Sequence, residues 1–218
     1  MGGNVTGSAE KPPGYYGNPR GDLLARLGQP LGRVLDIGCG AGATAKILRR
    51  RGATHLTGIE PHAESAQRAR DVFDTVLEGT VEDDLPQARG PFDTVLAYDV
   101  LEHLVDPYAV MAAVREQTAP GGQFHISTPN ARHWSLLKDL AVHGTFGYEL
   151  YGHRDSTHLR WFTAKDLAAA LRNAGWIVDE VTHQDIHPIT RLAKRATRGL
   201  TMEFMAYQWS VLARNPAG

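Results

Sequence analysis

The sequence has few of the features that mark a secreted or membrane-bound protein. Its 218 residues include a single cysteine, Cys39, which excludes an internal disulfide and any zinc site built on several thiolates. No apolar run approaches the ~20 residues that cross a bilayer, and the first residues lack the basic-then-apolar pattern of a signal peptide. We therefore expect a cytoplasmic protein with no membrane span and no dedicated zinc site.

Charge is nearly balanced as well. The formal net charge is −1, with 22% charged and 42% hydrophobic residues, which is ordinary for a globular protein and argues against a general nucleic-acid-binding surface. The length suits one α/β domain with elaborations. Residues 1–13 are rich in glycine, serine and proline, so we expect a flexible tail there and a single domain over residues 14–218.

One stretch organises the rest of the chain, and it reads Val34-Leu-Asp-Ile-Gly-Cys-Gly-Ala-Gly42. Its aliphatic residues predict the end of a buried strand, and its three glycines predict a tight turn that lets a ligand approach the backbone. Residues 43–51 have helix-forming composition, and the start of a helix offers free N–H groups to a polar ligand. Glu60 ends a second apolar strand about one βαβ unit later, where an acid accepts hydrogen bonds from ribose hydroxyls.

Dinucleotides and S-adenosylmethionine (SAM) both bind to such a turn. Here the glycines follow a G-x-G-x-G pattern, and Asp36 precedes them inside the strand end. The stretch LDIGCGAG resembles motif I of the class I SAM-dependent methyltransferases, in which that acid helps organise the loop around the methionine part of SAM. A nicotinamide enzyme is the main competing interpretation. A glycine turn that only packs a helix on a sheet would leave Asp36 and Glu60 unexplained.

Strand and helix signals alternate along the chain. Asn18-Pro19 predicts a helix ended by Gly28, and Asp106-Pro107 predicts another before a Pro120-Gly-Gly122 turn. Thr163 and Asp166 cap a helix that ends at Gly175. Strands are predicted at residues 34–37, 55–60, 75–77, 92–97, 123–127, 176–183 and 206–213.

This order predicts an α/β fold: a Rossmann-like, seven-stranded, mostly parallel sheet with helices on both faces. The last strand would pair antiparallel beside the sixth. That terminal pair is characteristic of class I methyltransferases and absent from most dehydrogenases, so it supports the methyltransferase interpretation independently of the glycine turn.

The resemblance to class I methyltransferases implies a set of cofactor-binding residues. They come from the segment before the sheet and from the carboxyl ends of the first four strands. SAM would be the cofactor and S-adenosylhomocysteine (SAH) the product. Many relatives place an acid at the position of Thr80. The threonine here matches the form seen in ubiquinone-type O-methyltransferases. The expected residues are Tyr16, Arg20, Asp36, Gly38, Cys39, Gly40, Glu60, Pro61, Thr80, Val81, Tyr98 and Asp99.

A hydroxyl acceptor must also lose its proton, commonly to a histidine or a carboxylate. Asp155-Ser-Thr-His-Leu-Arg160, followed by Trp161-Phe-Thr163, resembles a D-x-x-H-x-R-F-F-T pattern in small methyltransferases of polysaccharide and natural-product pathways. In this interpretation His158 is the general base, Asp155 orients it, and His103 is the alternative base. A structural role for His158, anchored to Asp155, stays open.

Asp99, Glu102 and His103 form an acid-x-x-Glu-His array after the fourth strand. In the ubiquinone-pathway O-methyltransferases that this stretch resembles, the corresponding array can hold magnesium. Many relatives carry Leu-Glu-His with no known metal. Our expectation is no metal, with Mg²⁺ at these three residues as the alternative.

Two long segments, about 130–161 and 184–205, follow carboxyl ends of strands and are expected to form substrate lids. A basic group in the second segment either recognises an acidic or phosphate-bearing substrate or forms a solvated face. That basic group comprises Arg191, Lys194, Arg195 and Arg198. A nucleic-acid substrate is disfavoured, because Tyr98-Asp-Val-Leu stands where base-modifying relatives carry D/N-P-P-Y/F.

These features predict a SAM-dependent methyltransferase that acts on a small molecule, with a hydroxyl of a sugar or natural product as the acceptor. The alternatives are an O-methyltransferase of a quinone or phenolic substrate and a SAM-binding partner protein without catalysis. The sequence does not determine the oligomeric state.

Overall fold

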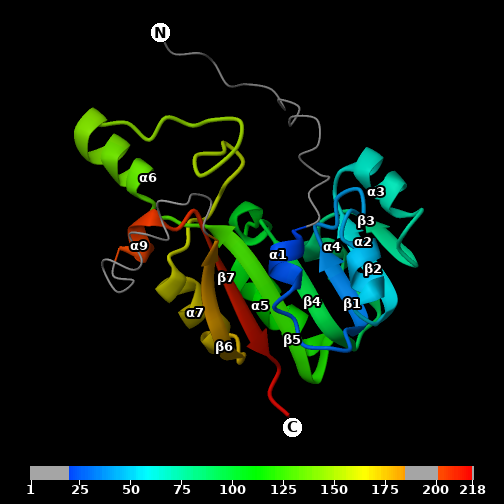
Figure 1. Ribbon diagram of the computed structural model, residues 1–218. Helices are drawn as coiled ribbons and strands as arrows, with labels where there is room; N and C mark the ends of the chain where they lie inside the picture. The colour runs from blue at the N-terminus through cyan, green and yellow to red at the C-terminus, as the bar shows by residue number, and fades with distance from the viewer. Residues whose placement is uncertain (1–19, 185–200, 218) are drawn as a thin grey trace.

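A computed structural model describes residues 20–184 and 201–217. Its centre is one seven-stranded sheet in the order β3-β2-β1-β4-β5-β7-β6, shown in Figure 1. Strands β1 to β5 are parallel, and β7 pairs antiparallel with both β5 and β6. The strands are β1 (Gly32–Ile37), β2 (Ala53–Glu60), β3 (Thr75–Glu78), β4 (Phe92–Tyr98), β5 (Thr118–Pro129), β6 (Ile177–Gln184) and β7 (Gln208–Arg214).

Short helices flank this sheet. The α-helices are α1 (Gly21–Leu24), α2 (Ala45–Arg50), α3 (Ala63–Ala69), α4 (Val81–Asp84), α5 (Pro107–Glu116), α6 (Trp134–Lys138), α7 (Ala164–Asn173) and α9 (Met202–Met205). Within the described residues, two 3₁₀ turns, η2 (Leu85–Ala88) and η3 (Leu101–His103), and a π turn, η4 (Asp139–His143), complete the elements. No helix in the described ranges is both long and apolar enough to cross a membrane.

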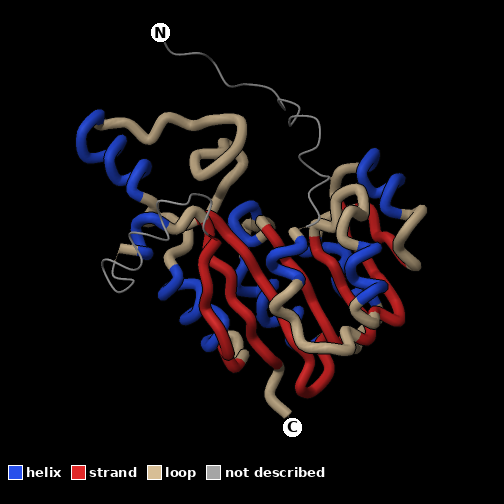
Figure 2. Tube along the Cα trace, in the orientation of Figure 1, coloured by secondary structure: helices blue, strands red, loops and turns tan. Residues whose placement is uncertain are grey.

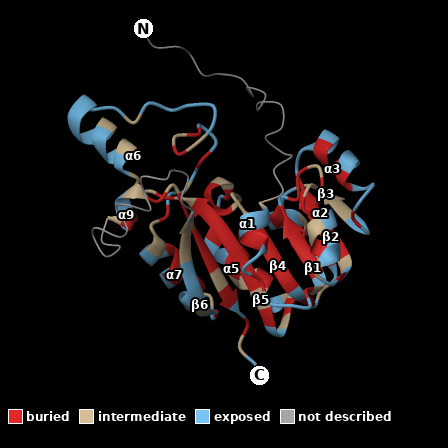
Figure 3. Cartoon of the chain, in the orientation of Figure 1, coloured by how far each residue is buried: buried red, intermediate tan, exposed pale blue. Residues whose placement is uncertain are grey.

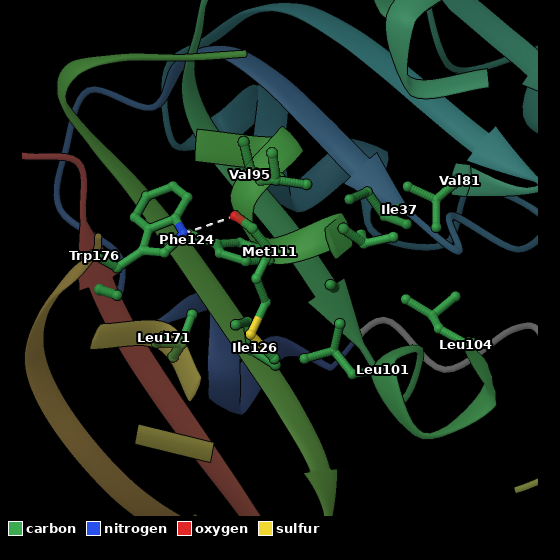
Figure 4. Packing of buried hydrophobic residues seen from close by; sticks show 14 of the residues in the cluster. Ile37, Val81, Val95, Leu101, Leu104, Met111, Phe124, Ile126, Leu171 and Trp176 are labelled. Carbon is green, nitrogen blue, oxygen red and sulfur yellow. Dashed lines mark hydrogen bonds between the residues drawn. The ribbon is translucent and has the colours of Figure 1, made fainter. Parts of the chain in front are cut away.

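Alternation along the strands builds a core on each face of the sheet. Val34 packs with α1, α2 and α3 residues, whereas the next residue, Leu35, packs with α5 and α7 residues. The strands between these layers are largely buried (Figure 3). In the α5–α7 layer the indole N–H of Trp176 donates to the carbonyl of Met111 at 2.9 Å (Figure 4). The predicted Rossmann-like fold with an antiparallel last strand is therefore confirmed.

Several boundaries differ from the sequence prediction. The first helix begins at Gly21, after the left-handed N-cap Arg20 at φ 44°, and ends at Leu24. It therefore covers one turn rather than the predicted stretch to Gly28. Strand β5 begins at Thr118, because the Pro120-Gly-Gly122 segment forms an irregularity inside the strand rather than a turn before it. Trp176 precedes β6, since its ring is buried against α5.

The first long segment leaves the carboxyl edge of the parallel strands, as Figures 1 and 2 show. It begins after β5, carries α6 and η4, and returns through a bridge between Asn130 and Phe162. The second long segment, the tail over residues 1–13 and the four basic residues at 191–198 lie outside the described residues, except for the stretch from Thr201 onward.

Candidate cofactor and acceptor site

A cavity of about 1010 Å³ opens at the carboxyl edge of β1, β2 and β4. This volume lies at the upper end of the range for small-molecule sites. All the predicted cofactor residues line it except Tyr16, which lies outside the described residues. The lining includes Arg20, Asp36, Gly38, Cys39, Gly40, Glu60, Pro61, Thr80, Val81, Tyr98 and Asp99.

The glycine turn after β1 has the backbone that its sequence requires. Gly38, Gly40 and Gly42 have φ angles of 72°, 55° and 81°, a region that side chains disfavour. A Cβ on Gly38 would lie 2.7 Å from Cγ2 of Val100, so the loop has no room for one. The turn therefore brings bare backbone to the cavity wall.

Glu60 ties the end of β2 to this turn. Its Oε2 accepts the Gly40 N–H and its Oε1 accepts the His62 N–H, both at 2.9 Å. The side chain is buried, and burial raises the pKa of Glu60, although the two backbone hydrogen bonds oppose that rise. Glu60 is predictable from the sequence, whereas His62 is not among the predicted residues, although its position two residues after Glu60 is an available signal.

Asp36 holds the turn from the other side. Its Oδ2 accepts a hydrogen bond from the Thr44 hydroxyl at 2.7 Å, so the strand end is joined to the start of α2. Burial raises the pKa of Asp36 to about 7, with a smaller rise from the nearby Glu60 charge. Thr44 was not predicted, because its hydroxyl reaches Asp36 only when the glycine turn folds the start of α2 back beside the end of β1.

Arg20 and Asp99 meet across the cavity although they are far apart in sequence. The Arg20 guanidinium donates to the Asp99 carboxylate and, at 2.7 Å, to Oε1 of Gln208 on β7. Gln208 donates in turn to Asp99, and the Ser127 hydroxyl donates to it at 3.2 Å. Asp99 is left-handed at φ 57°. The Asp99 carboxylate is thus hydrogen-bonded by Arg20 at the N-cap of α1, by Ser127 on β5 and by Gln208 on β7.

The loop after β3 forms a helix start rather than an open loop. The Thr80 hydroxyl accepts the Asp83 N–H at 3.3 Å and caps α4. Val81 is buried at the first position of this helix. Both residues lie on the cavity wall.

A second wall continues beyond Asp99 and comes from two separate segments. His103, Leu104 and Val105 follow β4, and Thr157 belongs to the first long segment. The segments are joined by backbone bonds from the N–H groups of residues 159 and 160 to the Glu102 carbonyl, at 2.7 and 3.0 Å. Nδ1 of His103 also lies 3.2 Å from the Thr157 carbonyl.

Of the two predicted bases, His103 lines the cavity, whereas His158 is buried and 6% exposed. Their rings meet edge to face with centroids 4.8 Å apart. Asp155 and His158 do share a tight turn, through a 3.0 Å bond from the His158 N–H to the Asp155 carbonyl. The Asp155 carboxylate accepts the N–H and hydroxyl of Thr157, at 2.9 and 2.7 Å.

Three potential ligand side chains converge behind this wall. Atoms of Glu102, His103 and His158 lie within 4.8 Å of one another, the one such cluster in the described residues. The array predicted from the sequence contained Asp99 in place of His158. Asp99 instead binds Arg20 and Gln208.

The residues present fit SAM. A bare glycine loop, an acid at the end of β2 and a capped turn after β3 line one cavity, in the order that the class I resemblance implies. When bound, SAM supplies an electrophilic methyl group on a sulfonium. Methyl transfer is a displacement, so most of what the protein provides is positioning.

Comparison with known proteins agrees with this geometry. Residues 15–181 match a family of methyltransferase domains. The chain is 32% identical over 174 residues to the ubiquinone biosynthesis O-methyltransferase of Marinobacter nauticus, covering 74% of this chain and 71% of the relative. It is 31% identical over 194 residues to the protein of that name from Xanthomonas axonopodis pv. citri, covering 85% and 79%.

Solved structures show the same fold. A SAM-dependent methyltransferase from Archaeoglobus fulgidus matches with a TM-score of 0.63 at 18% identity, covering 85% of this chain and 87% of that one. A methyltransferase of Haloferax volcanii, solved with the Trm112 activator, matches with a TM-score of 0.64 at 21% identity, covering 91% and 88%. The chain belongs to the class I SAM-dependent methyltransferase family and is a methyltransferase enzyme.

Proposed function

We propose that the enzyme methylates a hydroxyl group of a small-molecule acceptor. The observation that carries this proposal is His103, a histidine on the acceptor-side wall of the cavity that also contains the cofactor residues. The relatives are named as O-methyltransferases, which supports oxygen as the methylated atom. Because the family and the intact cofactor residues make the chain an enzyme, a non-catalytic partner protein is set aside.

In this proposal His103 takes the acceptor proton and His158 supports it from behind. His158 is the first candidate from the sequence, but His103 is the one of the two that lines the cavity. Its Nδ1 lies 3.2 Å from the Thr157 carbonyl and 3.1 Å from the Thr157 hydroxyl, whose own hydrogen is donated to Asp155. Both oxygens therefore accept, which assigns the hydrogen to Nδ1 and the lone pair of a base to Nε2. Asp155 contributes by holding Thr157 in place.

The acceptor wall favours a phenolic or quinol ring. Leu104 and Val105 give the wall an apolar surface beside His103. The relatives' names also point to quinone biosynthesis. The resemblance of residues 155–163 to enzymes of polysaccharide and natural-product pathways supports a sugar or natural-product hydroxyl as the second candidate.

An acidic group on the acceptor is a further part of the proposal. Arg160 donates to the carbonyls of Leu159, at 2.9 Å, and of Val105, so its contacts leave the guanidinium charge without an acidic partner among the described residues.

Mg²⁺ is not required in this scheme. Asp99, which the sequence alternative assigned to the metal, is held by Arg20.

The experiment is a methyl-transfer assay with labelled SAM and matched catechols and glycosides, each read by mass spectrometry. His103→Ala should lose about a hundredfold or more in turnover with SAH affinity unchanged. His143→Ala, on the 52% exposed side chain of η4, is the control. Full turnover by His103→Ala would reject His103 as the base. Methylated glycosides without methylated catechols would favour the sugar candidate.

A further inference from the structure

His125 is a histidine buried inside the sheet. Its side chain is 1% exposed, and on β5 it pairs with Leu96 of β4 on one side and with Leu212 of β7 on the other. Paired residues of neighbouring strands point to the same face of a sheet. Both leucines pack in the apolar layer that contains residues of α1, α2 and α3. An aliphatic side chain would suit this layer, so the histidine requires another explanation.

Tyr98 is a hydrogen-bond partner of this ring. Nδ1 of His125 lies 2.9 Å from the Tyr98 hydroxyl, and the two rings meet edge to face with centroids 5.4 Å apart. Nε2 of His125 is buried and has no hydrogen-bond partner in the part of the chain that the structure describes. A buried polar atom left unmatched costs free energy, and a histidine retained at that cost indicates a function.

Tyr98 connects the buried histidine to the cavity. It ends β4, and it lines the cavity together with Asp99. The guanidinium carbon of Arg20 lies over the Tyr98 ring, 5.9 Å from its centre, which is within the range of a cation–π contact. The same guanidinium binds Asp99 and Gln208. Tyr98 is therefore held at its hydroxyl by His125 and at its ring by Arg20.

The hydrogen bond acts at the far end of the tyrosine side chain. Two torsion angles set the direction of a tyrosine ring, and a partner at the hydroxyl restricts both of them. Because this ring forms part of the cavity wall, its direction shapes the space that the cofactor enters. A wall that is already in one arrangement loses less conformational entropy when a ligand binds.

We propose that His125 is a positioning residue for the cofactor, whose Nδ1 holds the Tyr98 hydroxyl and so fixes the ring on the cavity wall. His125 lies outside the cavity lining, so it acts through Tyr98. The inference concerns the cofactor side of the site and does not depend on which acceptor is methylated. The alternative is a histidine that only joins β4 to β5 and serves stability.

Calorimetric titration with SAH tests this hold in a set of variants. Tyr98→Phe removes the hydroxyl and keeps the ring, whereas His125→Leu removes both ring nitrogens at similar size. Each should weaken SAH binding about fivefold or more. The double variant should be no weaker than either single variant, because the same interaction is lost in all three.

Two further variants serve as rescue and control. His125→Asn should restore most of the SAH affinity, because its amide can replace Nδ1 as a donor or an acceptor. Tyr108→Phe removes a hydroxyl from a side chain that is 55% exposed, and it should bind SAH as the unchanged protein does. In Tyr98→Phe the Nδ1 signal of His125 in nitrogen NMR should be displaced.

Stability separates positioning from a structural role. Because Nε2 is unmatched in an apolar layer, His125→Leu should leave the urea midpoint unchanged or raise it while SAH binding falls. Tyr98→Phe decides the matter if His125→Leu fails to fold. Normal SAH binding in Tyr98→Phe or in His125→Leu overturns the proposal. Losses that add in the double variant, or a His125→Asn as weak as His125→Leu, also overturn it. Turnover of His103→Ala tests the proposed function separately.

Discussion

At the scale of single residues, two buried acids support the glycine turn by different bonds. Glu60 accepts two backbone N–H groups, one of them from Gly40 inside the turn. Asp36 accepts a side-chain hydroxyl from Thr44. Burial raises the pKa of both, because the interior disfavours the charged form of each carboxyl. The turn is therefore held rigid at the expense of two desolvated carboxyls.

Replacing Glu60 by alanine should weaken SAM binding by at least about tenfold, or ~1.4 kcal/mol. The Gly40 and His62 N–H groups would lose their acceptor, and the ribose would lose its proposed one. Titration calorimetry measures the change. Glu64→Ala provides the control, because that side chain is 75% exposed on α3. Equal affinities in both variants would contradict the assignment.

The raised pKa of Asp36 predicts a pH dependence of stability. Between the usual value of 3.8 and the folded value of about 7, the folded state holds a proton that the unfolded state has released. The free energy of unfolding should therefore fall as pH rises through this window, by a few kcal/mol at most. Buried Glu60 and Glu102 act in the same direction. Asp36→Asn should make the decline shallower.

Urea unfolding at about pH 5 and about pH 7.5 measures this decline. Asp74→Asn is the control. Burial raises the pKa of Asp74, but the hydrogen bonds from Leu56 and Arg49 and the charges of Arg49 and His55 together outweigh it and lower that pKa below its usual 3.8. Asp74 therefore affects the pH dependence only below about pH 4, and Asp74→Asn should leave the decline between about pH 5 and about pH 7.5 unchanged. An unchanged slope in Asp36→Asn would show that its carboxyl titrates as in the unfolded chain.

At the scale of elements, Asn130 joins the end of β5 to the segment before β7. It is fully buried, and its amide donates to the carbonyls of Glu203 and Ala206, both at 2.9 Å. Its Oδ1 accepts the Arg132 N–H at 2.9 Å. One side chain thus connects the base of the first long segment to α9, and the strand pair β5–β7 holds it in place.

Asn130→Ala should lower the free energy of unfolding by about 3 kcal/mol, because it leaves buried backbone groups without partners. Urea denaturation measures the loss, and hydrogen exchange should show faster exchange at residues 201–207. Asn173→Ala, exposed at the end of α7, is the comparison and should change stability little. A similar stability for both variants would mean that Asn130 does not carry this connection.

At the scale of the whole molecule, one cavity is lined by both the glycine turn after β1 and the wall after β4, so cofactor binding should stabilise both. SAH at about 100 times its Kd should add about 2.7 kcal/mol to the free energy of unfolding. Hydrogen exchange should slow together at residues 36–44 and 99–105. NADH at the same concentration serves as the control. Stabilisation by NADH and none by SAH would contradict the cofactor assignment.

Much of this architecture could be predicted from local sequence. Apolar runs and glycine turns defined the seven strands, since burial between helical layers requires aliphatic side chains on both faces of a strand. The turn at Gly38 and the acids Asp36 and Glu60 could be identified because their roles depend on neighbours one βαβ unit away. The irregularity at Pro120-Gly-Gly122 could not be predicted, because proline and glycine residues in this order are compatible with either a turn or an irregular strand.

Contacts between distant segments were decided by the tertiary structure. Asp99 is bound by Arg20 and Gln208, residues 79 and 109 positions away. The Glu102–His103–His158 cluster forms because the long segment after β5 folds back onto the loop after β4. Sequence by itself predicted the fold through local periodicity and spacing, and the resemblance of LDIGCGAG to motif I predicted the cofactor. The arrangement of the acids and histidines at the acceptor wall depended on long-range packing, which no local pattern encodes.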